Sequence, residues 1–288
     1  MFYPQKILCP VDFSPQSGAA LRVAGGLAGI FGAELTVAHA RQIELPLYFT
    51  KAQVEMLKAQ MRRSGKASRA YLEDFAAKYV PAGFSYSLLV MEGDPVAAIL
   101  KSLTESRAGL LVMGTHGRTG LTRIRMGSVA ESVLRQVSLP ILTVGPHVRP
   151  SASRGTIRRV ICPVNYSDLA RRALDHAVAI AEKAGAELIV THVLESSAEA
   201  KDAEKERETL CGWLPNDMRD RCTLREVVRR GHAAEQIILE TQDSEADLLV
   251  IGAQRCSFLG SLLFGSTTES IIRGAPSPVL SVIAPEPK

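Results

Sequence analysis

The sequence predicts an α/β protein built from two tandem copies of one domain, each with a doubly wound parallel sheet. Three observations predict this: a length of 288 residues, an internal repeat, and apolar strand-like runs that alternate with helical segments in both halves. The length is about twice the usual size of a single domain. Continuous apolar strands separated by helices are typical of a parallel sheet that helices cover on both faces.

The repeat is visible in two alignments without gaps. Residues 6–40 align with residues 159–193, and 14 of the 35 positions are identical. Residues 93–144 align with residues 231–282, where LLVMG matches LLVIG and GSVAES matches GSTTES. Between the copies, Pro146–Gly155 is rich in Pro, Ser, Gly and Arg, which is typical of a linker. We therefore expect two domains, at residues 1–150 and 151–288.

Local signals place the elements of the first copy in order. The first strand is a short apolar run ended by Asp12, and Ser14 followed by Pro15 predicts a helix that starts with an N-cap. Next come small apolar residues at helical spacing, a second buried strand, and a long helix that stops at Pro81-Ala82-Gly83. The expected strands are Ile7–Val11, Leu35–Ala38, Phe84–Val90, Leu110–Met113 and Ile141–Val144, and the expected helices are Ala19–Ile30, Thr50–Tyr79, Pro95–Leu103 and Ser128–Val137.

Composition narrows the classes of function. The net charge is only +4, and no dense basic block is interleaved with aromatic residues, which argues against nucleic-acid binding. None of the five cysteines forms a C-x-x-C pair, and no His/Cys set has the spacing of a zinc site. The N-terminus lacks the apolar core of a signal peptide, and no apolar stretch approaches about 18 residues. We expect a reduced, cytoplasmic protein that does not bind a membrane.

The candidate site follows from the rule that open α/β sheets bind ligands beyond the carboxyl ends of their strands, at the topological switch point. In the first copy these ends carry Asp12, the pair His39-Ala40 and the loop Gly114-Thr115-His116-Gly117. The loop opens the pattern Gly-x2-Gly-x9-Gly-Ser, which closes with Gly127-Ser128 directly before a helix. Glycines let a backbone approach phosphates closely, and a helix N-terminus offers unpaired N–H groups. Two glycines after a strand are also compatible with an ordinary tight turn, but the full spacing favours a phosphate loop.

This pattern, together with CPVDFS at the end of the first strand, resembles the ATP-binding type of universal stress protein. The resemblance covers both copies and so nearly the whole chain. It implies a five-stranded parallel sheet of the adenine-nucleotide α-hydrolase-like, Rossmann-type kind, with ATP, with or without Mg²⁺, lying across the strand ends. By position it places Pro10, Val11, Asp12 and Ala40 at the adenine and ribose, Met113 and Gly114 under the ribose, and Gly117, Arg118, Gly127, Ser128 and Val129 around the phosphates.

The chemistry of single residues leaves alternatives open. Asp12 can accept a hydrogen bond from a ribose hydroxyl or an adenine amino group, and it can also cap the following helix. Ser128 can cap its helix or donate to a phosphate oxygen. Arg118 suits a phosphate by charge and fork geometry, or it is a solvated loop residue. For His116 we expect a side chain that stabilises the turn.

In the second copy two of these positions differ. Asp12 is replaced by Asn165, and Gly117 by Arg255, whose side chain would oppose close approach of the backbone to a ligand. We therefore expect that this copy does not bind ATP in the family manner, unless Arg255 folds over the phosphates as a cation. Gly265-Ser266 is retained, so the helix N-terminus could still hold a lone anion.

Three further features have structural interpretations. His39 and His192 occupy the same place in both copies, which favours a structural role at the strand end. The charged segment Ala198–Thr209 is expected to be an exposed helix without a site. Trp213, the only tryptophan, is expected to anchor the shortened helix of the second copy.

The leading hypothesis is a nucleotide-binding regulatory protein of the stress-response type, with no catalytic residues assigned. The chain has no Walker A lysine loop, no clear magnesium carboxylate pair and no obvious general base. The alternatives are a slow ATPase or nucleotidyl-transfer enzyme on the same fold, and a scaffold that binds no nucleotide. The last strands, Ile141–Val144 and Val279–Val282, are edges that invite pairing. They predict a pseudo-dimer within one chain, or a homodimer of chains.

Overall fold

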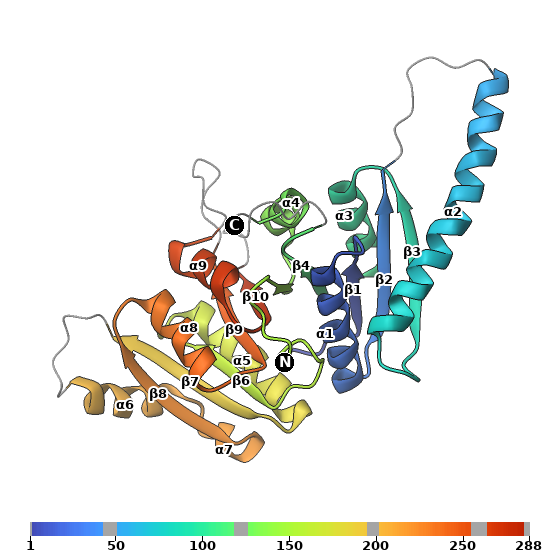
Figure 1. The fold of residues 1–288 in the computed structure, drawn as a ribbon. Coiled ribbons are helices and arrows are strands. Elements are labelled where there is room, and N and C mark those ends of the chain that lie inside the picture. Colours follow the sequence, from blue (N-terminus) through green and yellow to red (C-terminus); the bar gives the residue numbers. More distant parts are fainter. Residues whose placement is uncertain (1, 43–50, 118–125, 195–201, 255–263, 285–288) are drawn as a thin grey trace.

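A computed structural model gives the fold of the chain (Figure 1). It describes residues 2–42, 51–117, 126–194, 202–254 and 264–284. Arg118 and Arg255 lie outside these ranges, as do Thr50, where an expected helix begins, and residues 198–201 of the charged segment.

The elements alternate between strand and helix in both copies. The first copy consists of β1 (Lys6–Pro10), α1 (Pro15–Phe31), β2 (Glu34–Arg41), α2 (Lys51–Tyr79), β3 (Tyr86–Glu92), α3 (Pro95–Ser106), β4 (Leu110–Gly114), α4 (Ser128–Gln136) and β5 (Ile141–Val144). The second consists of β6 (Arg159–Pro163), α5 (Asp168–Ala184), β7 (Glu187–Leu194), α6 (Asp202–Trp213), α7 (Met218–Arg221), β8 (Leu224–Arg230), α8 (Ala233–Asp243), β9 (Leu248–Ala253), α9 (Ser266–Gly274) and β10 (Val279–Ile283). The expected elements of the first copy are confirmed, with ends that differ by a few residues.

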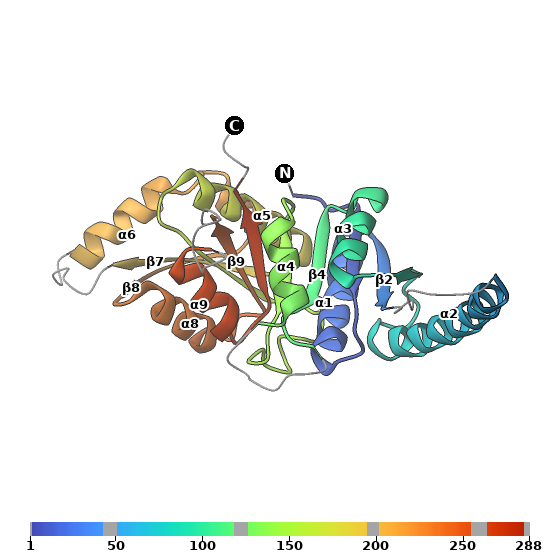
Figure 2. The ribbon, with the colours of Figure 1, turned by 90° about the horizontal axis from the view of Figure 1, so that it is seen from above.

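The ten strands of the described residues form one sheet, in the order β3-β2-β1-β4-β5-β10-β9-β6-β7-β8. Within each copy every neighbouring pair is parallel, as predicted. The two copies meet where β5 pairs with β10 in antiparallel register. The prediction that the last strands pair within one chain is thus confirmed. Figure 2 shows the resulting elongated molecule, with α2 and α6 at opposite ends.

Helices cover both faces of the sheet, so the strands are buried on both sides. On one face, buried residues of α1, α2 and α5 form a single cluster that runs across both copies. On the other face, buried residues of α3, α4, α8 and α9 form a second cluster. This two-sided burial explains the uninterrupted apolar strands in the sequence.

The first helix of each copy is defined by the same end signals. Ser14 accepts a hydrogen bond from the Ser17 N–H at 3.1 Å, which confirms the predicted N-cap. In the second copy Ser167 plays the same role toward Ala170. Gly32 ends α1 in the left-handed conformation, with a φ of 64° that glycine adopts without steric cost.

The linker between the copies is packed against the first helix through two glycines. A Cβ atom built on Gly26 would lie 1.8 Å from the carbonyl oxygen of Gly155. Gly155 has a φ of +83°, and a Cβ there would lie 2.6 Å from the Arg22 carbonyl oxygen. Neither position can accept a side chain without movement of backbone. On the same helix, Gly29 has nothing within 4 Å of its built Cβ.

Gly26→Ala should therefore destabilise the protein by about 1–3 kcal/mol, because an added methyl group in a filled space forces the backbone apart. The matched control, Gly29→Ala, should stabilise it by about 0.5–1 kcal/mol, because alanine is the better helix former. Urea denaturation followed by far-UV circular dichroism gives both values. Equal effects of the two substitutions would show that the linker does not pack on α1 in this way.

Candidate functional site

The candidate site of the first copy lies at the carboxyl ends of β1 and β4. In the sheet β1 lies between β2 and β4, so the connections that leave β1 and β4 meet at the switch point. The structure brings Asp12 and Gly117 together there. A Cβ atom built on Gly117 would lie 2.6 Å from Asp12 Oδ2, so the glycine leaves room for the carboxylate.

Asp12 is held in place by the backbone that follows it. Its Oδ1 accepts a hydrogen bond from the Ser14 N–H at 3.0 Å. The N-cap of α1 is Ser14, so the alternative in which Asp12 itself caps the helix is wrong. With Oδ1 fixed by this turn, Oδ2 is the oxygen that faces the glycine loop.

The residue after Asp12 has an unusual backbone conformation. Phe13 adopts a φ of 66°, and its counterpart Tyr166 a φ of 61°. Left-handed backbone costs a non-glycine residue about 1–2 kcal/mol. Aromatic packing offsets this cost in the first copy, since the Phe13 ring lies 4.3 Å from that of His39 and 4.5 Å from that of Tyr71, measured between centroids.

The two strand-end histidines make the same contact in both copies. Nδ1 of His39 lies 2.7 Å from the Val11 carbonyl oxygen, and Nδ1 of His192 lies 2.8 Å from that of Val164. In each ring an Nδ1–H group donates to the carbonyl oxygen. The structural role predicted for this pair is therefore confirmed.

The glycine loop is fixed at both of its described ends. A Cβ atom on Gly114 would lie 3.1 Å from the backbone of Gln16, so the loop leaves β4 in close contact with α1. The Gly127 N–H donates to the Thr115 carbonyl oxygen at 2.8 Å, which brings the start of α4 back to the end of β4. Nδ1 of His116 lies 2.8 Å from Thr115 Oγ1, as expected of a side chain that stabilises the turn.

Among the described residues, none provides a side-chain cap at the N-terminus of α4. Its N-cap is Gly127, and Ser128 is the first helical residue, so the alternative in which Ser128 caps the helix is wrong. The N–H groups of the first turn, from Ser128 to Ala130, lack acceptors within their own helix. Such an uncapped N-terminus carries a partial positive charge and suits an anion.

The equivalent place in the second copy contains a cavity of about 390 Å³. Its lining includes the counterparts of the first-copy site, among them Pro163, Val164, Asn165, Val193, Ile251, Gly252 and Gly265. Asn165 differs from Asp12 in its contacts, because its Oδ1 accepts hydrogen bonds from both the N–H and the hydroxyl of Ser167. This cavity was not predicted from the sequence.

A polar cluster beside this cavity was also missed. Glu206, on α6, accepts a hydrogen bond from the Tyr166 hydroxyl, and its Oε1 lies 3.4 Å from Nε2 of His192. Burial and the Glu206 hydrogen bond raise the pKa of Tyr166. The expectation that Ala198–Thr209 has no role beyond an exposed face is therefore wrong for Glu206, whose side chain is only 20% exposed. The tyrosine hydroxyl, absent from Phe13, was the available signal.

Trp213 anchors α6, as predicted. Its indole ring lies 5.6 Å from the Tyr166 ring between centroids, and the Arg171 guanidinium lies 3.6 Å above it. The latter distance is typical of a cation–π contact.

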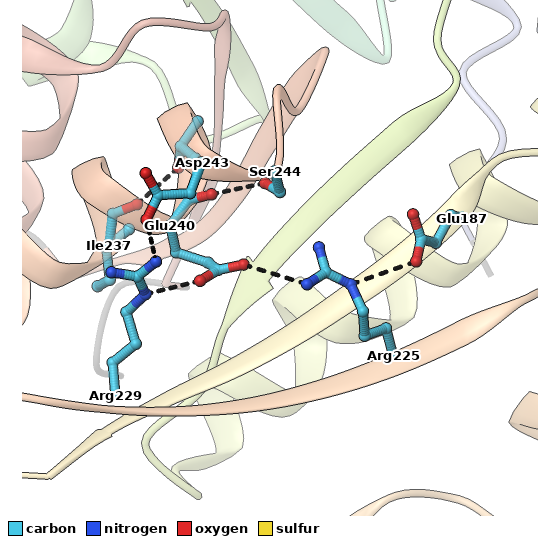
Figure 3. Close-up of polar contacts among 8 residues, drawn as sticks. Glu187, Arg225, Arg229, Ile237, Glu240, Asp243 and Ser244 are labelled. Atoms are coloured by element: carbon cyan, nitrogen blue, oxygen red, sulfur yellow. Dashed lines mark hydrogen bonds and ion pairs between the residues drawn. The ribbon is translucent and has the colours of Figure 1, made fainter.

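One wall of the cavity is fixed by an ion-pair network (Figure 3). Glu240, on α8, is 4% exposed, and its carboxylate contacts Arg229 at 2.6 Å and Arg225 at 3.6 Å, both from β8. Arg225 also reaches Glu187 on β7, and Arg229 reaches Asp243. One turn before Glu240, Ile237 lines the cavity. In the first copy the counterparts of Arg229 and Glu240 are neutral: the Ser102 hydroxyl donates to the Met91 sulfur.

Comparisons with known proteins agree on one family. The sequence model of the universal stress protein family matches residues 4–145 and again residues 156–282. A universal stress protein of Mycolicibacterium smegmatis is 25% identical over 96% of this chain and 96% of its own length. One from Methanocaldococcus jannaschii is 30% identical over 49% of this chain and 81% of its own length. The fold resembles the crystal structure of a universal stress protein from Archaeoglobus fulgidus, with a TM-score of 0.68, 21% identity, and coverage of 97% of this chain and 98% of that one.

Two further features are absent from the described residues. No group of three or more His, Cys, Asp or Glu side chains there could hold a metal ion. Nor does any helix in these ranges have the length and apolar character of a membrane span.

The buried ion pair gives a prediction. Glu240→Ser should destabilise the protein by about 3 kcal/mol or more, because it leaves Arg229 partly buried without its main partner. Arg229→Met combined with Glu240→Ser restores the neutral pair of the first copy and should recover most of that loss. Denaturant midpoints of the single and double variants measure both effects.

The control for this cycle is the exposed pair Lys101 and Glu105, whose side chains are 74% and 66% exposed. Lys101→Met with Glu105→Ser should change stability by no more than about 0.5 kcal/mol. The double variant at Arg229 and Glu240 could instead be as unstable as Glu240→Ser alone. That result would contradict the inference that these ion pairs hold one wall of the cavity in place.

Proposed function

The chain belongs to the universal stress protein family, and on this premise we propose that it is a regulatory protein that binds ATP, with or without Mg²⁺, in its first domain. The proposed domains are residues 1–150, with the binding motif intact, and residues 151–288, with the motif altered. ATP occupancy would bias which conformation or partner the protein selects.

The contact between Asp12 and Gly117 carries this proposal. The loop approaches the carboxylate so closely that a methyl group on Gly117 would not fit, and glycine is the residue that permits such a close approach of the backbone. The uncapped start of α4 lies next to it, because the Gly127 N–H is bonded to Thr115 of the same loop. A hydrogen-bond acceptor and an anion site are thus held side by side. That combination suits a molecule with ribose hydroxyls at one end and phosphates at the other.

The other proposed contacts follow from position along the strand ends. Pro10, Val11 and Ala40 flank Asp12 and would contact the adenine, while Met113 and Gly114 would lie under the ribose. Ser128 and Val129 would donate backbone N–H groups to the phosphates, and Gly127, whose own N–H donates to the Thr115 carbonyl oxygen, would let the phosphates approach closely. Arg118 stays a proposed phosphate ligand from the sequence alone.

Signal transfer to the second domain has a direct route in this arrangement. The loop that would hold the phosphates leaves β4, and the Thr115 N–H is bonded to the Val144 carbonyl at the end of β5. Since β5 pairs with β10, a shift of the loop acts on the strand pair that joins the two domains. We therefore place the regulatory output at this junction.

ATP should bind with a stoichiometry of one per chain, measured by isothermal titration calorimetry. Asp12→Asn, which installs the residue of the second copy, should weaken ATP at least about tenfold, because a charged acceptor contributes about 1.5–3 kcal/mol. Gly117→Ala should have a similar effect, because its methyl group displaces the Asp12 carboxylate or closes the loop.

The matched control is Asn165→Asp, the reverse exchange in the second domain, which should leave the affinity and the stoichiometry of ATP unchanged. Two ATP molecules per chain, or undiminished affinity in the Asp12→Asn protein, would contradict the proposed division between the domains. Absence of any ATP binding would favour a scaffold that binds no nucleotide.

A further inference from the structure

A groove of about 550 Å³ lies where the first domain meets helix α5 of the second. Gln5, Gly109 and Pro140 line it, and they directly precede β1, β4 and β5. The candidate ATP site lies at the carboxyl ends of β1 and β4, so this junction groove is at the opposite edge of the sheet. Arg172 and Asp175 of α5 belong to its second wall. A molecule bound here would therefore contact both domains.

The start of the chain holds the two walls of the junction groove together (Figure 1). The buried ring of Phe2 lies 5.7 Å from that of Phe31 on α1 and 4.4 Å from that of His176 on α5, measured between centroids. The His176 ring is fixed in turn, because its Nδ1–H donates to the Arg172 carbonyl oxygen at 2.8 Å. The groove is thus formed before anything binds, which lowers the cost of binding.

In the second domain, the linker occupies the place that corresponds to this groove. By the alignment of the two copies, residues 107–109 correspond to residues 245–247, and α5 corresponds to α1. Arg149 of the linker donates to the Ala246 carbonyl oxygen at 2.6 Å. The linker therefore contacts the segment that leads into β9, as an occupant of the junction groove would contact the segment that leads into β4.

The linker also contacts the helix on the other side of this place. Arg22 of α1, the counterpart of Asp175, donates to the Ser153 carbonyl oxygen at 3.4 Å. The Ser153 N–H donates to the Arg149 carbonyl oxygen at 3.2 Å, so that residues 149–153 form a turn. Ala152 and Ser153 are buried. The repeat unit thus accommodates a short peptide turn between its strand starts and the first helix of the other copy.

The charge on the strand side is opposite in the two copies. Arg107 lines the junction groove, and its counterpart is Glu245. The two residues share a left-handed backbone, with φ values of 53° and 48°, so their side chains leave the chain in the same way. Glu245 pairs with Arg159 at 3.0 Å. Arg107, and Arg172 on the facing wall, make no ion pair with any residue in the described part of the chain.

We propose that the junction groove binds a short turn of an acidic peptide segment from a partner protein. Its carboxylate would lie beside Arg107, in the place where the linker carries Arg149 in the second domain. Asp175, which stands where Arg22 donates to the linker, would accept a backbone N–H of the segment. The inference goes beyond the proposed function and does not depend on ATP binding, because the groove is at the other edge of the sheet.

The test uses a synthetic peptide of residues 146–155 in which Arg149 is replaced by Glu, added to the full-length protein at up to millimolar concentration. The unchanged peptide of residues 146–155 is its matched control. Amide NMR signals of Arg107, Gly109 and His176 should shift with the acidic peptide. The acidic peptide should bind about tenfold more tightly than its control, because the charge contact changes from repulsion to attraction.

Arg107→Glu installs the residue of the second copy and should reverse this preference, so that the peptide with Arg149 binds more tightly. The melting temperature should be unchanged, because Glu245 shows that glutamate adopts this backbone conformation. Lys101→Glu changes the net charge by the same amount on the same helix, at a side chain that is 74% exposed. It should keep the wild-type preference.

Equal binding of the two peptides, or binding of neither, overturns the proposal. So does an unchanged preference in the Arg107→Glu protein. Displacement of the acidic peptide by an equal concentration of inorganic phosphate would show a general anion site and would also overturn it. Failure of ATP binding would contradict the proposed function alone, because the peptide titration is carried out without nucleotide.

Discussion

The antiparallel pairing of β5 with β10 is the constraint on which the rest of the structure depends. Thr143, Leu142 and Ile141 face Val279, Leu280 and Ser281 in register, and all six residues are buried. Two edge strands that would each expose unpaired backbone groups thereby become the centre of one sheet. The strands within each copy are parallel, and β5 and β10 are antiparallel. The carboxyl ends of the strands in the two copies therefore point in opposite directions along the strand axis. The two candidate sites are therefore separated, and each can specialise without altering the other.

The two halves differ by substitutions that keep the backbone arrangement and change the chemistry of the side chains. Asp12 and Gly117 correspond to Asn165 and Arg255, and Ala38 corresponds to Thr191. Outside the site, the neutral contact between Met91 and Ser102 is replaced by the ion pair of Arg229 and Glu240. Because a buried ion pair adds little net stability over an apolar pair, its value in the second domain lies in fixing the position of α8. In the first domain, glycine instead allows the loop to approach the Asp12 carboxylate closely.

Sequence patterns predicted the alternation of strands and helices in a parallel sheet, the Ser14 cap and the meeting of Asp12 with the glycine loop, because each depends on local periodicity or on the switch-point rule. They did not predict the contact of Glu206 with Tyr166 and His192. A charged helix is usually solvated, and nothing in its own sequence shows which residue it contacts across the fold. The cavity in the second copy was missed for a related reason, since a threonine in a strand is an ordinary strand former. The alignment of the two copies contained the signal, because Phe13 and Ala38 of the first copy correspond to residues with hydroxyl groups, Tyr166 and Thr191, in the second.

The turn after the first strand has the same backbone conformation in both copies, although the polar side chain at its start differs. Phe13 and Tyr166 share a left-handed backbone although the residues before them differ in charge. If a ligand imposed this conformation, the copy with the altered motif would have no reason to keep it. The strain is instead maintained by the packing of an aromatic ring on the strand-end histidine, which occurs in both copies. The backbone of the site is thus fixed by the fold. In both copies the Oδ1 atom accepts a hydrogen bond from the following turn, so the residue at position 12 or 165 decides whether the second polar atom is a carboxylate oxygen or an amide nitrogen.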